Sequence, residues 1–348
     1  MSKIRVLIIE DSLVVRELLK HIIGLDDRFE VVAAVESAEE GLSRLEALAP
    51  DVISLDIRLP GMNGLDATLQ IMQRRPTPIV VVAANVDDDE LNIAMNALRA
   101  GALSVVEKPV GVTNAAFESM ARHLCTQLAI MSQVRVVRQG IDRGLRFGTT
   151  AEPPPPPKGT RYAMLGLVAS TGGPQALTQV LTGLGPDYPL PILLVQHITA
   201  SFLDGFVSWL AGVTPFAVRI AQGGEVPEPG VIFVPPVDRH LRLAGGKLAL
   251  SDLAPVHSQR PSGSVLLSSM ADDLGRNGLG VILTGMGSDG AEGMAAMHKA
   301  GAYTIAQDES TCVVYGMPQA AVKLRAVSEV VPLPGISQRL RELSGGRA

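Results

Sequence analysis

Short apolar runs alternate with segments of helical spacing through the first 110 residues of the chain. The runs cover residues 6–9, 31–35, 52–55, 79–82 and 104–106. Between the first two runs, apolar residues from Val15 to Ile23 recur at intervals of three and four, which is typical of one face of a helix. The alternation predicts an α/β domain with a five-stranded, doubly wound parallel sheet.

A different pattern follows this domain. A helix is predicted from Thr113 or Asn114 to about Val134, and apolar periodicity is then lost through residues 135–160. The five consecutive prolines at 153–157 favour an extended, semi-rigid spacer. We therefore place the first domain at residues 1–130 and a basic, proline-rich linker at residues 131–160.

The strand and helix alternation resumes at Tyr162. Apolar runs predict strands at residues 165–169, 192–196, 281–284 and 303–306, and the intervening helical patterns cover residues 174–184, 202–210, 265–274 and 291–300. The sequence around Gly245 and Gly246 predicts a hairpin over residues 240–250. Residues 161–348 thus form a second α/β domain, with a mainly parallel sheet and one β-hairpin.

Charge and composition exclude several classes of function. The first domain has 12 basic and 19 acidic residues, and the second has 13 and 14, so neither carries the basic excess that nucleic-acid binding requires. The two cysteines have no metal-ligand spacing and favour a reducing compartment. The N-terminus lacks a signal peptide pattern, which predicts a cytoplasmic protein without membrane insertion.

Acidic residues end two strands of the first domain. Glu10 and Asp11 follow the first strand, Asp56 ends the third, and Lys108 ends the fifth. The carboxyl ends of these strands meet at one edge of the sheet, where three carboxylates need a divalent cation to relieve their repulsion. This set favours a site where Mg²⁺, held by Glu10, Asp11 and Asp56, assists phosphoryl transfer to Asp56, with Lys108 neutralising the incoming anion.

Helix capping is the simpler interpretation of Asp11 taken alone. The stretches 8–12, 55–64 and 107–109 together, however, resemble the receiver domain of two-component response regulators over about residues 3–130. The resemblance implies a chemotaxis histidine kinase as phosphodonor. Ala83 and Val105 depart from the receiver pattern, because they stand where a hydroxyl residue and an aromatic switch residue are usual.

Three strand ends of the second domain carry Ser170, His197 and Asp289, the inventory of a nucleophilic hydrolase. Ser170 precedes two glycines and a proline, which permit a tight turn into a helix whose backbone N–H groups suit an oxyanion. A phosphate-binding glycine loop is the alternative, although Gly-Lys-Ser/Thr is absent. His197 would serve as the base and Asp289 would orient it, whereas a lone histidine after a strand is more often structural.

The stretches that carry a second resemblance are 169–174, 196–198, 235–240, 280–290 and 306–318. Residues 162–343 resemble the catalytic domain of the chemotaxis protein-glutamate methylesterases. The resemblance implies a Ser170, His197 and Asp289 triad, with Thr171 beside the nucleophile and the Met286 N–H in the oxyanion hole. It implies no cofactor for the esterase.

The implied activity is hydrolysis of glutamate methyl esters on the cytoplasmic helices of chemoreceptors, which releases methanol and is regulated by phosphorylation. Related proteins also deamidate glutamines. One alternative is a non-catalytic module that docks a kinase and receptors, which retention of all three triad residues disfavours. A DNA-binding regulator is disfavoured by the near-neutral second domain.

Overall fold

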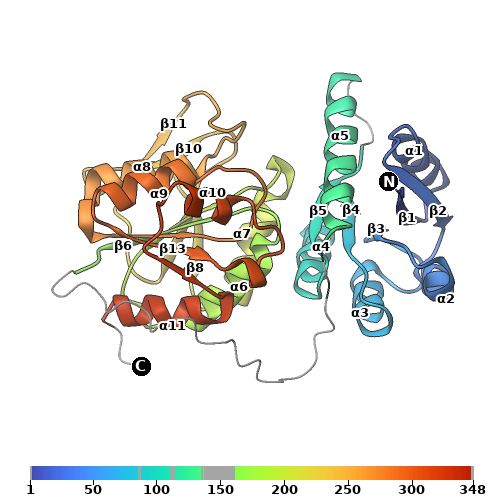
Figure 1. The fold of residues 1–348 in the computed structure, drawn as a ribbon, viewed down its shortest axis with the longest axis horizontal. Coiled ribbons are helices and arrows are strands. Elements are labelled where there is room, and N and C mark those ends of the chain that lie inside the picture. Colours follow the sequence, from blue (N-terminus) through green and yellow to red (C-terminus); the bar gives the residue numbers. More distant parts are fainter. Residues whose placement is uncertain (1, 85–87, 110–113, 135, 137–160, 346–348) are drawn as a thin grey trace. The chain divides into compact units, whose positions relative to one another are not determined.

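The computed structural model describes residues 2–84, 88–109, 114–134, 136 and 161–345, which form two compact units (Figure 1). Most of the predicted linker at residues 131–160 lies outside the described residues, as does Thr113 at the predicted helix start. No helix within the described ranges is long and apolar enough to cross a membrane.

The first unit has a five-stranded parallel sheet of order β2-β1-β3-β4-β5. Its strands are β1 (Ile4–Ile9), β2 (Phe29–Val35), β3 (Val52–Asp56), β4 (Ile79–Ala83) and β5 (Ser104–Glu107). Its helices are α1 (Leu13–Gly24), α2 (Ala38–Leu48), α3 (Gly64–Arg74), α4 (Asp88–Arg99) and α5 (Asn114–Met131). Helix α1 packs with α5, and α3 packs with both α2 and α4, so the predicted doubly wound architecture is confirmed.

The second unit has a seven-stranded parallel sheet of order β14-β13-β12-β6-β7-β9-β8. Its strands are β6 (Met164–Ala169), β7 (Ile192–Gln196), β8 (Ala217–Ile220), β9 (Val231–Val234), β12 (Gly278–Ile282), β13 (Tyr303–Gln307) and β14 (Glu329–Val331). The predicted hairpin forms a separate antiparallel pair, β10 (His240–Ala244) and β11 (Lys247–Ser251). The predicted mainly parallel sheet with a hairpin is therefore confirmed.

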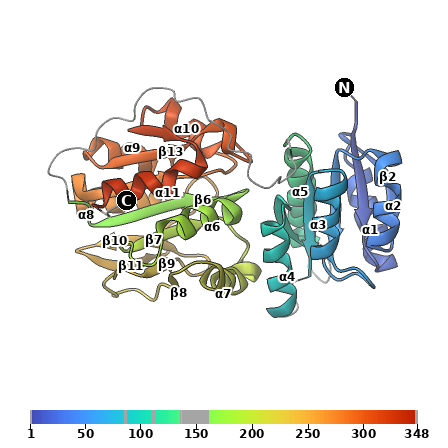
Figure 2. The same cartoon turned by 90° about the horizontal axis from the view of Figure 1, so that it is seen from below.

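Helices cover both faces of this second sheet (Figures 1 and 2). Helices α8 (Gly263–Leu274), α9 (Ala291–Lys299) and α10 (Met317–Lys323) lie together on one face. Helices α6 (Gly173–Leu184), α7 (Leu203–Val213) and α11 (Leu333–Leu343) lie on the other. Short 3₁₀ turns η1 (Ala200–Phe202), η2 (Gly275–Asn277) and η3 (Glu309–Thr311) complete the unit.

The order in which successive strands are added to this sheet reverses between β6 and β12. From β6 it proceeds through α6 to β7, and from β12 it proceeds through α9 to β13 on the opposite side. The loops that follow β6 and β12 therefore diverge to opposite faces, which opens a crevice at the carboxyl ends of the two strands. All five residues of β12 and all six of β6 are buried, so these loops rest on a rigid support.

Candidate active site

Ser170 lies in the turn between β6 and α6, at one side of this crevice. Its N–H donates to the Thr284 carbonyl oxygen at 3.1 Å, and its own carbonyl oxygen accepts from the Gly173 N–H at 2.8 Å. Gly172 caps the helix with a φ of 76°, a conformation that favours glycine, and a Cβ there would lie 2.6 Å from Val313. The sequence thus folds into a turn that holds Ser170 at a helix N-terminus.

His197 extends the ladder between β6 and β7. The ladder pairs Ala169 with Gln196, and the His197 N–H donates to the Ala169 carbonyl oxygen at 3.0 Å. Ser170 and His197 are therefore neighbours, each one residue beyond the end of its strand. Within the described part of the chain, neither the Ser170 Oγ nor the His197 Nδ1 has a hydrogen-bond partner, so both atoms remain free for chemistry.

Asp289 reaches His197 from the loop after β12. The Nε2 of His197 lies 2.8 Å from the Asp289 Oδ2, and the two side chains are 9% and 2% exposed. Because an ionised carboxylate only accepts hydrogen bonds, Nε2 carries the proton and Nδ1 presents a lone pair. This tautomer is the one that can remove a proton from a hydroxyl next to Nδ1.

The Asp289 carboxylate also caps helix α8. Its Oδ1 accepts hydrogen bonds from the Ser262 hydroxyl at 2.6 Å and the Ser264 N–H at 3.1 Å, and its Oδ2 accepts from the Gly263 N–H at 2.6 Å. Burial alone would raise the pKa of Asp289, but the contacts with His197, Ser262 and Gly263 outweigh it and lower the pKa to about 2. Asp289 is thus a fixed negative charge.

His240, at the start of β10, does not line the site. It is fully buried, its Nδ1 accepts from the Ser262 N–H at 3.1 Å, and its Nε2 lies 3.2 Å from the Ala254 carbonyl oxygen. The ring therefore positions Ser262, which in turn holds Asp289. These contacts give His240 a structural role.

Gln196 connects the two catalytic turns. Its buried Nε2 donates to the carbonyl oxygens of Ser170 and His197, each at 2.9 Å. A Cβ at Gly173 would overlap the Gln196 Oε1, so the second glycine of the turn is required by this side chain. Sequence reasoning missed this role, although an amide at the end of an otherwise apolar strand was a signal for it.

Thr284 connects the turn after β6 to the loop after β12. The strand predicted over residues 281–284 ends at Ile282, because the Thr284 N–H donates instead to the Gln307 Oε1 at 2.8 Å. The Thr284 hydroxyl lies 3.0 Å from the Thr171 carbonyl oxygen and accepts from the Val314 N–H at 3.0 Å. This buried threonine was also missed from the sequence.

Met286 is held close to the nucleophile by its neighbour. A Cβ on Gly285 would lie 2.8 Å from the Ser170 Cβ, so the peptide that links Gly285 to Met286 lies beside Ser170. Across the described residues the Met286 N–H has no acceptor, and the side chain is 45% exposed. Such a free N–H beside a hydroxyl suits an oxyanion. Thr171 follows Ser170 directly.

The first unit gathers its predicted residues at the equivalent edge. Carboxylate oxygens of Glu10, Asp11 and Asp56 lie within 4.8 Å of one another, and Glu10 and Asp56 are buried. The Lys108 Nζ lies 2.8 Å from the Asp56 Oδ2 and 3.0 Å from the Glu10 Oε2, and it donates a hydrogen bond to the Glu10 Oε1 at 3.1 Å.

Burial and mutual repulsion dominate this acidic cluster. Burial raises the pKa of Glu10 to about 7, with a further rise from the Asp56 charge, and burial also raises the pKa of Asp56. For Lys108, the two carboxylates outweigh burial and raise its pKa. Three carboxylates whose oxygens lie this close together, with one lysine beside two of them, fit a hard divalent cation such as Mg²⁺.

The two departures from the receiver pattern lie next to this cluster. Ala83 ends β4, is fully buried, and accepts a hydrogen bond from the Lys108 N–H at 2.8 Å through its carbonyl oxygen. Val105 lies on the neighbouring strand β5, paired with Val81. Neither side chain can donate a hydrogen bond to a group on Asp56.

Comparisons with known proteins cover both units. Residues 165–340 match the family model for CheB methylesterase, and residues 6–116 match that for the response regulator receiver domain. A protein-glutamate methylesterase/protein-glutamine glutaminase of Paramagnetospirillum magneticum is 68% identical over 99% of each chain. One from Myxococcus xanthus is 42% identical over 97% of this chain and 96% of that relative.

A solved structure agrees with these matches. The CheB methylesterase catalytic domain of Thermotoga maritima is 32% identical, with a TM-score of 0.51, and the match covers 53% of this chain and 100% of that structure. The sheet order, the Ser170, His197 and Asp289 crevice and the full-length relatives all lead to one assignment. The chain belongs to the CheB methylesterase family, with a response regulator receiver domain in front of its catalytic domain.

Proposed function

We propose that this chain hydrolyses glutamate γ-methyl esters of proteins to glutamate and methanol, and that it also deamidates protein glutamines. The names of its relatives support both activities. The observation that carries the proposal is the 2.8 Å contact between the His197 Nε2 and the Asp289 Oδ2, which leaves the His197 Nδ1 without a hydrogen-bond partner among the described residues. The protein substrates are the cytoplasmic helices of chemoreceptors.

The proposed reaction proceeds through an acyl-enzyme. The Ser170 Oγ attacks the ester carbonyl carbon while the His197 Nδ1 accepts the serine proton, and the imidazolium is stabilised by Asp289. The tetrahedral oxyanion accepts a hydrogen bond from the Met286 N–H. The same proton then passes to the leaving methoxide, which departs as methanol, or to the leaving amine, which departs as ammonia. Water, activated by His197, releases the glutamate and regenerates Ser170.

Methanol release from methylated receptor membranes tests this proposal. Ser170→Ala and His197→Ala should each reduce the rate by several orders of magnitude, and the double variant should lose little more, because nucleophile and base act as a unit. Ser201→Ala, in the turn η1, provides a serine control outside the crevice. Near-full activity of Ser170→Ala would contradict the triad.

For the first unit, we propose phosphorylation of Asp56 by a chemotaxis histidine kinase. Glu10, Asp11 and Asp56 would hold Mg²⁺, which supplies charge neutralisation for an incoming phosphoryl group. The Asp56 Oδ2 would attack the phosphorus of the kinase phosphohistidine, the P–N bond would break as the imidazole leaves, and Lys108 would pair with the phosphoryl oxygens. Incorporation of phosphate from a small phosphodonor should require Mg²⁺ and disappear in Asp56→Asn, and label that persisted in this variant would contradict the site.

A further inference from the structure

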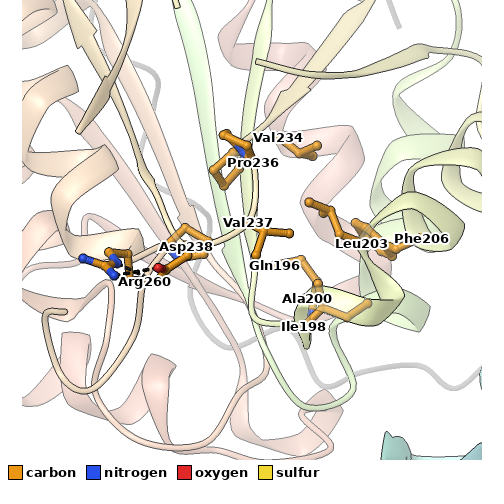
Figure 3. A pocket seen from close by; sticks show the side chains of 12 residues that line it. Gln196, Ile198, Ala200, Leu203, Phe206, Val234, Pro236, Val237, Asp238 and Arg260 are labelled. Atoms are coloured by element: carbon orange, nitrogen blue, oxygen red, sulfur yellow. Dashed lines mark hydrogen bonds and ion pairs between the residues drawn. The ribbon is translucent and has the colours of Figure 1, made fainter. Parts of the chain in front are cut away.

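A pocket of about 280 Å³ lies beside the candidate active site, at the carboxyl ends of β7 and β9 (Figure 3). The ladder between these strands pairs Ile192 with Ile232 and Leu193 with Phe233, and it does not continue to the strand ends. The strands therefore separate before Gln196 and Val234. The space that opens between them is the pocket.

Apolar side chains form most of its wall. Figure 3 shows Val237 pointing across the pocket toward Leu203 and Phe206, with Ile198 and Ala200 nearby. Val237 is 47% exposed and so remains accessible to a ligand. A concave site lined mainly by apolar side chains suits an apolar group.

The only ion pair among the lining residues leaves the pocket without net charge. Arg260 donates two hydrogen bonds of 2.7 Å to Asp238, and its Nη1 lies 3.4 Å and 3.3 Å from the carbonyl oxygens of Asp252 and Leu253. Asp238 has a φ of 55°, in the left-handed region, and the paired Arg260 holds it there. This clamp stabilises the wall next to Val237.

The pocket adjoins the turns that hold Ser170 and His197. Gln196 lines it, and the same side chain donates to the carbonyl oxygens of Ser170 and His197. Ile198, on the other side of His197, lines it as well. A protein whose glutamyl group lies at Ser170 and His197 therefore places its neighbouring residues over this pocket.

We propose that the pocket is a specificity subsite that receives one apolar side chain of the protein substrate, from a residue near the reacting glutamate. This inference rests on the proposed function. The volume is at the low end for small-molecule sites, which suits a single side chain. On a helical substrate, the residues three and four positions away share the face of the glutamate, about 5–6 Å from it.

Two peptides and one small ester test the subsite on the full-length chain. Both peptides carry one glutamate γ-methyl ester. They differ only at the positions three and four residues before and after this glutamate, which are all leucine in one peptide and all asparagine in the other. The native chain should favour the leucine peptide by roughly tenfold or more in kcat/KM. N-acetylglutamate γ-methyl ester, which has no neighbouring residues, measures the chemical step alone.

Two variants change the pocket without changing the catalytic residues. Ala200→Phe fills it, and Val237→Ser makes its wall polar. Both should reduce the leucine preference toward unity and leave hydrolysis of the small ester unchanged. Val226→Ser is the matched control, since Val226 is 64% exposed and does not line the pocket. Fluorescence of Trp209, the only tryptophan of the chain, checks folding of the catalytic domain.

Any outcome other than a leucine preference that both pocket variants lose would contradict the subsite. If the native chain did not prefer the leucine peptide, or if the pocket variants kept that preference, the pocket would not bind the substrate. Variants that accelerate the small ester in the full-length chain would assign the pocket to a segment of the first domain instead. If the native chain hydrolysed none of the three esters, the proposed function would fail, and that result differs from a lost preference.

Discussion

At the scale of single residues, the positions of Ser170 and His197, the proposed nucleophile and base, depend on Gln196. Its amide nitrogen satisfies the carbonyl oxygens of both Ser170 and His197, and its orientation is fixed because Oε1 could not replace a donor there. We expect Gln196→Glu, which keeps the shape but loses the donor, to reduce kcat at least tenfold. Two lost hydrogen bonds cost about 1–3 kcal/mol.

Methanol release and Trp209 fluorescence together check this prediction. The kcat should fall more than KM rises, because the amide nitrogen donates to the Ser170 and His197 carbonyl oxygens and so acts on the reacting groups. Gln222→Glu, in an exposed loop, is the control for adding a carboxylate to the same domain. Unchanged kcat in Gln196→Glu would mean that the two turns hold their positions without this amide.

Asp289 makes stability depend on pH. Its pKa is about 2 in the folded chain against an ordinary 3.8, so its stabilising contribution is complete above pH 4 and is lost as pH falls toward 2. Asp289→Asn should therefore reduce the free energy of unfolding by about 2 kcal/mol at pH 6, and by about 1 kcal/mol less at pH 3. Denaturant unfolding followed at Trp209 measures both, and a difference independent of pH would contradict the assignment.

The sequence predicted the residues that end buried strands, and it missed those that act through distant contacts. Ser170, His197 and Asp289 each follow an apolar run, so parallel strands bring them to one edge. Ser262 contacts Asp289, and His240 contacts Ser262, only through the fold, across 27 and 22 positions of sequence, and no local pattern marks such contacts. A polar residue in a buried strand end, as at Gln196, was the one available signal.

At the scale of elements, strand prediction depended on burial. The strands β6, β7 and β13 are fully buried and read as continuous apolar runs. The edge strands β8 and β14 were missed, because β8 alternates exposed and half-buried residues and β14 has three residues. The strand β9, which lies next to the edge strand β8, was missed as well, since its four apolar residues are followed by two prolines.

The turn from β6 to α6 can be tested through its second glycine. A Cβ at Gly173 would overlap the Gln196 Oε1 and lie 2.9 Å from the Ala169 Cβ. We expect Gly173→Ala to displace Gln196, to destabilise the catalytic domain by about 1–3 kcal/mol, and to reduce methanol release. Gly212→Ala is the control, since Gly212 lies on helix α7 with nothing within 4 Å of a Cβ. Equal stability and activity of both variants would refute the close packing.

At the scale of the whole molecule, two domains share one chain. Because one chain carries both domains, each is at a high effective concentration with respect to the other, and we expect the unphosphorylated receiver to restrain the esterase. Residues 160–348 alone should then hydrolyse receptor esters faster than the full-length chain without phosphodonor. Initial rates of methanol release at equal concentrations compare the two proteins, and equal rates would show that the receiver does not gate access.

Phosphorylation should activate this chain weakly, because Ala83 lacks the hydroxyl and Val105 lacks the aromatic ring that would respond to a phosphoryl group on Asp56. A ligand shifts a conformational equilibrium only by its differential affinity for the two states. Ala83 offers no hydroxyl to a phosphoryl group on Asp56, and the missing hydrogen bond to a charged group is worth about 1.5–3 kcal/mol of that difference. Val105 provides no aromatic ring that could change its position in response to the phosphoryl group.

Restoring both contacts should strengthen the response. Ala83→Ser combined with Val105→Phe should raise the fold-activation by a small phosphodonor about tenfold or more, since one hydrogen bond of that strength corresponds to a factor of at least ten. The same double substitution with Asp56→Asn is the control, and it should abolish activation. Val105 is half-buried next to a fully buried Ala83, so the unphosphorylated rate and folding of each protein are measured first. Strong activation of the native chain, with no gain in the double variant, would show that another route connects Asp56 to the catalytic crevice.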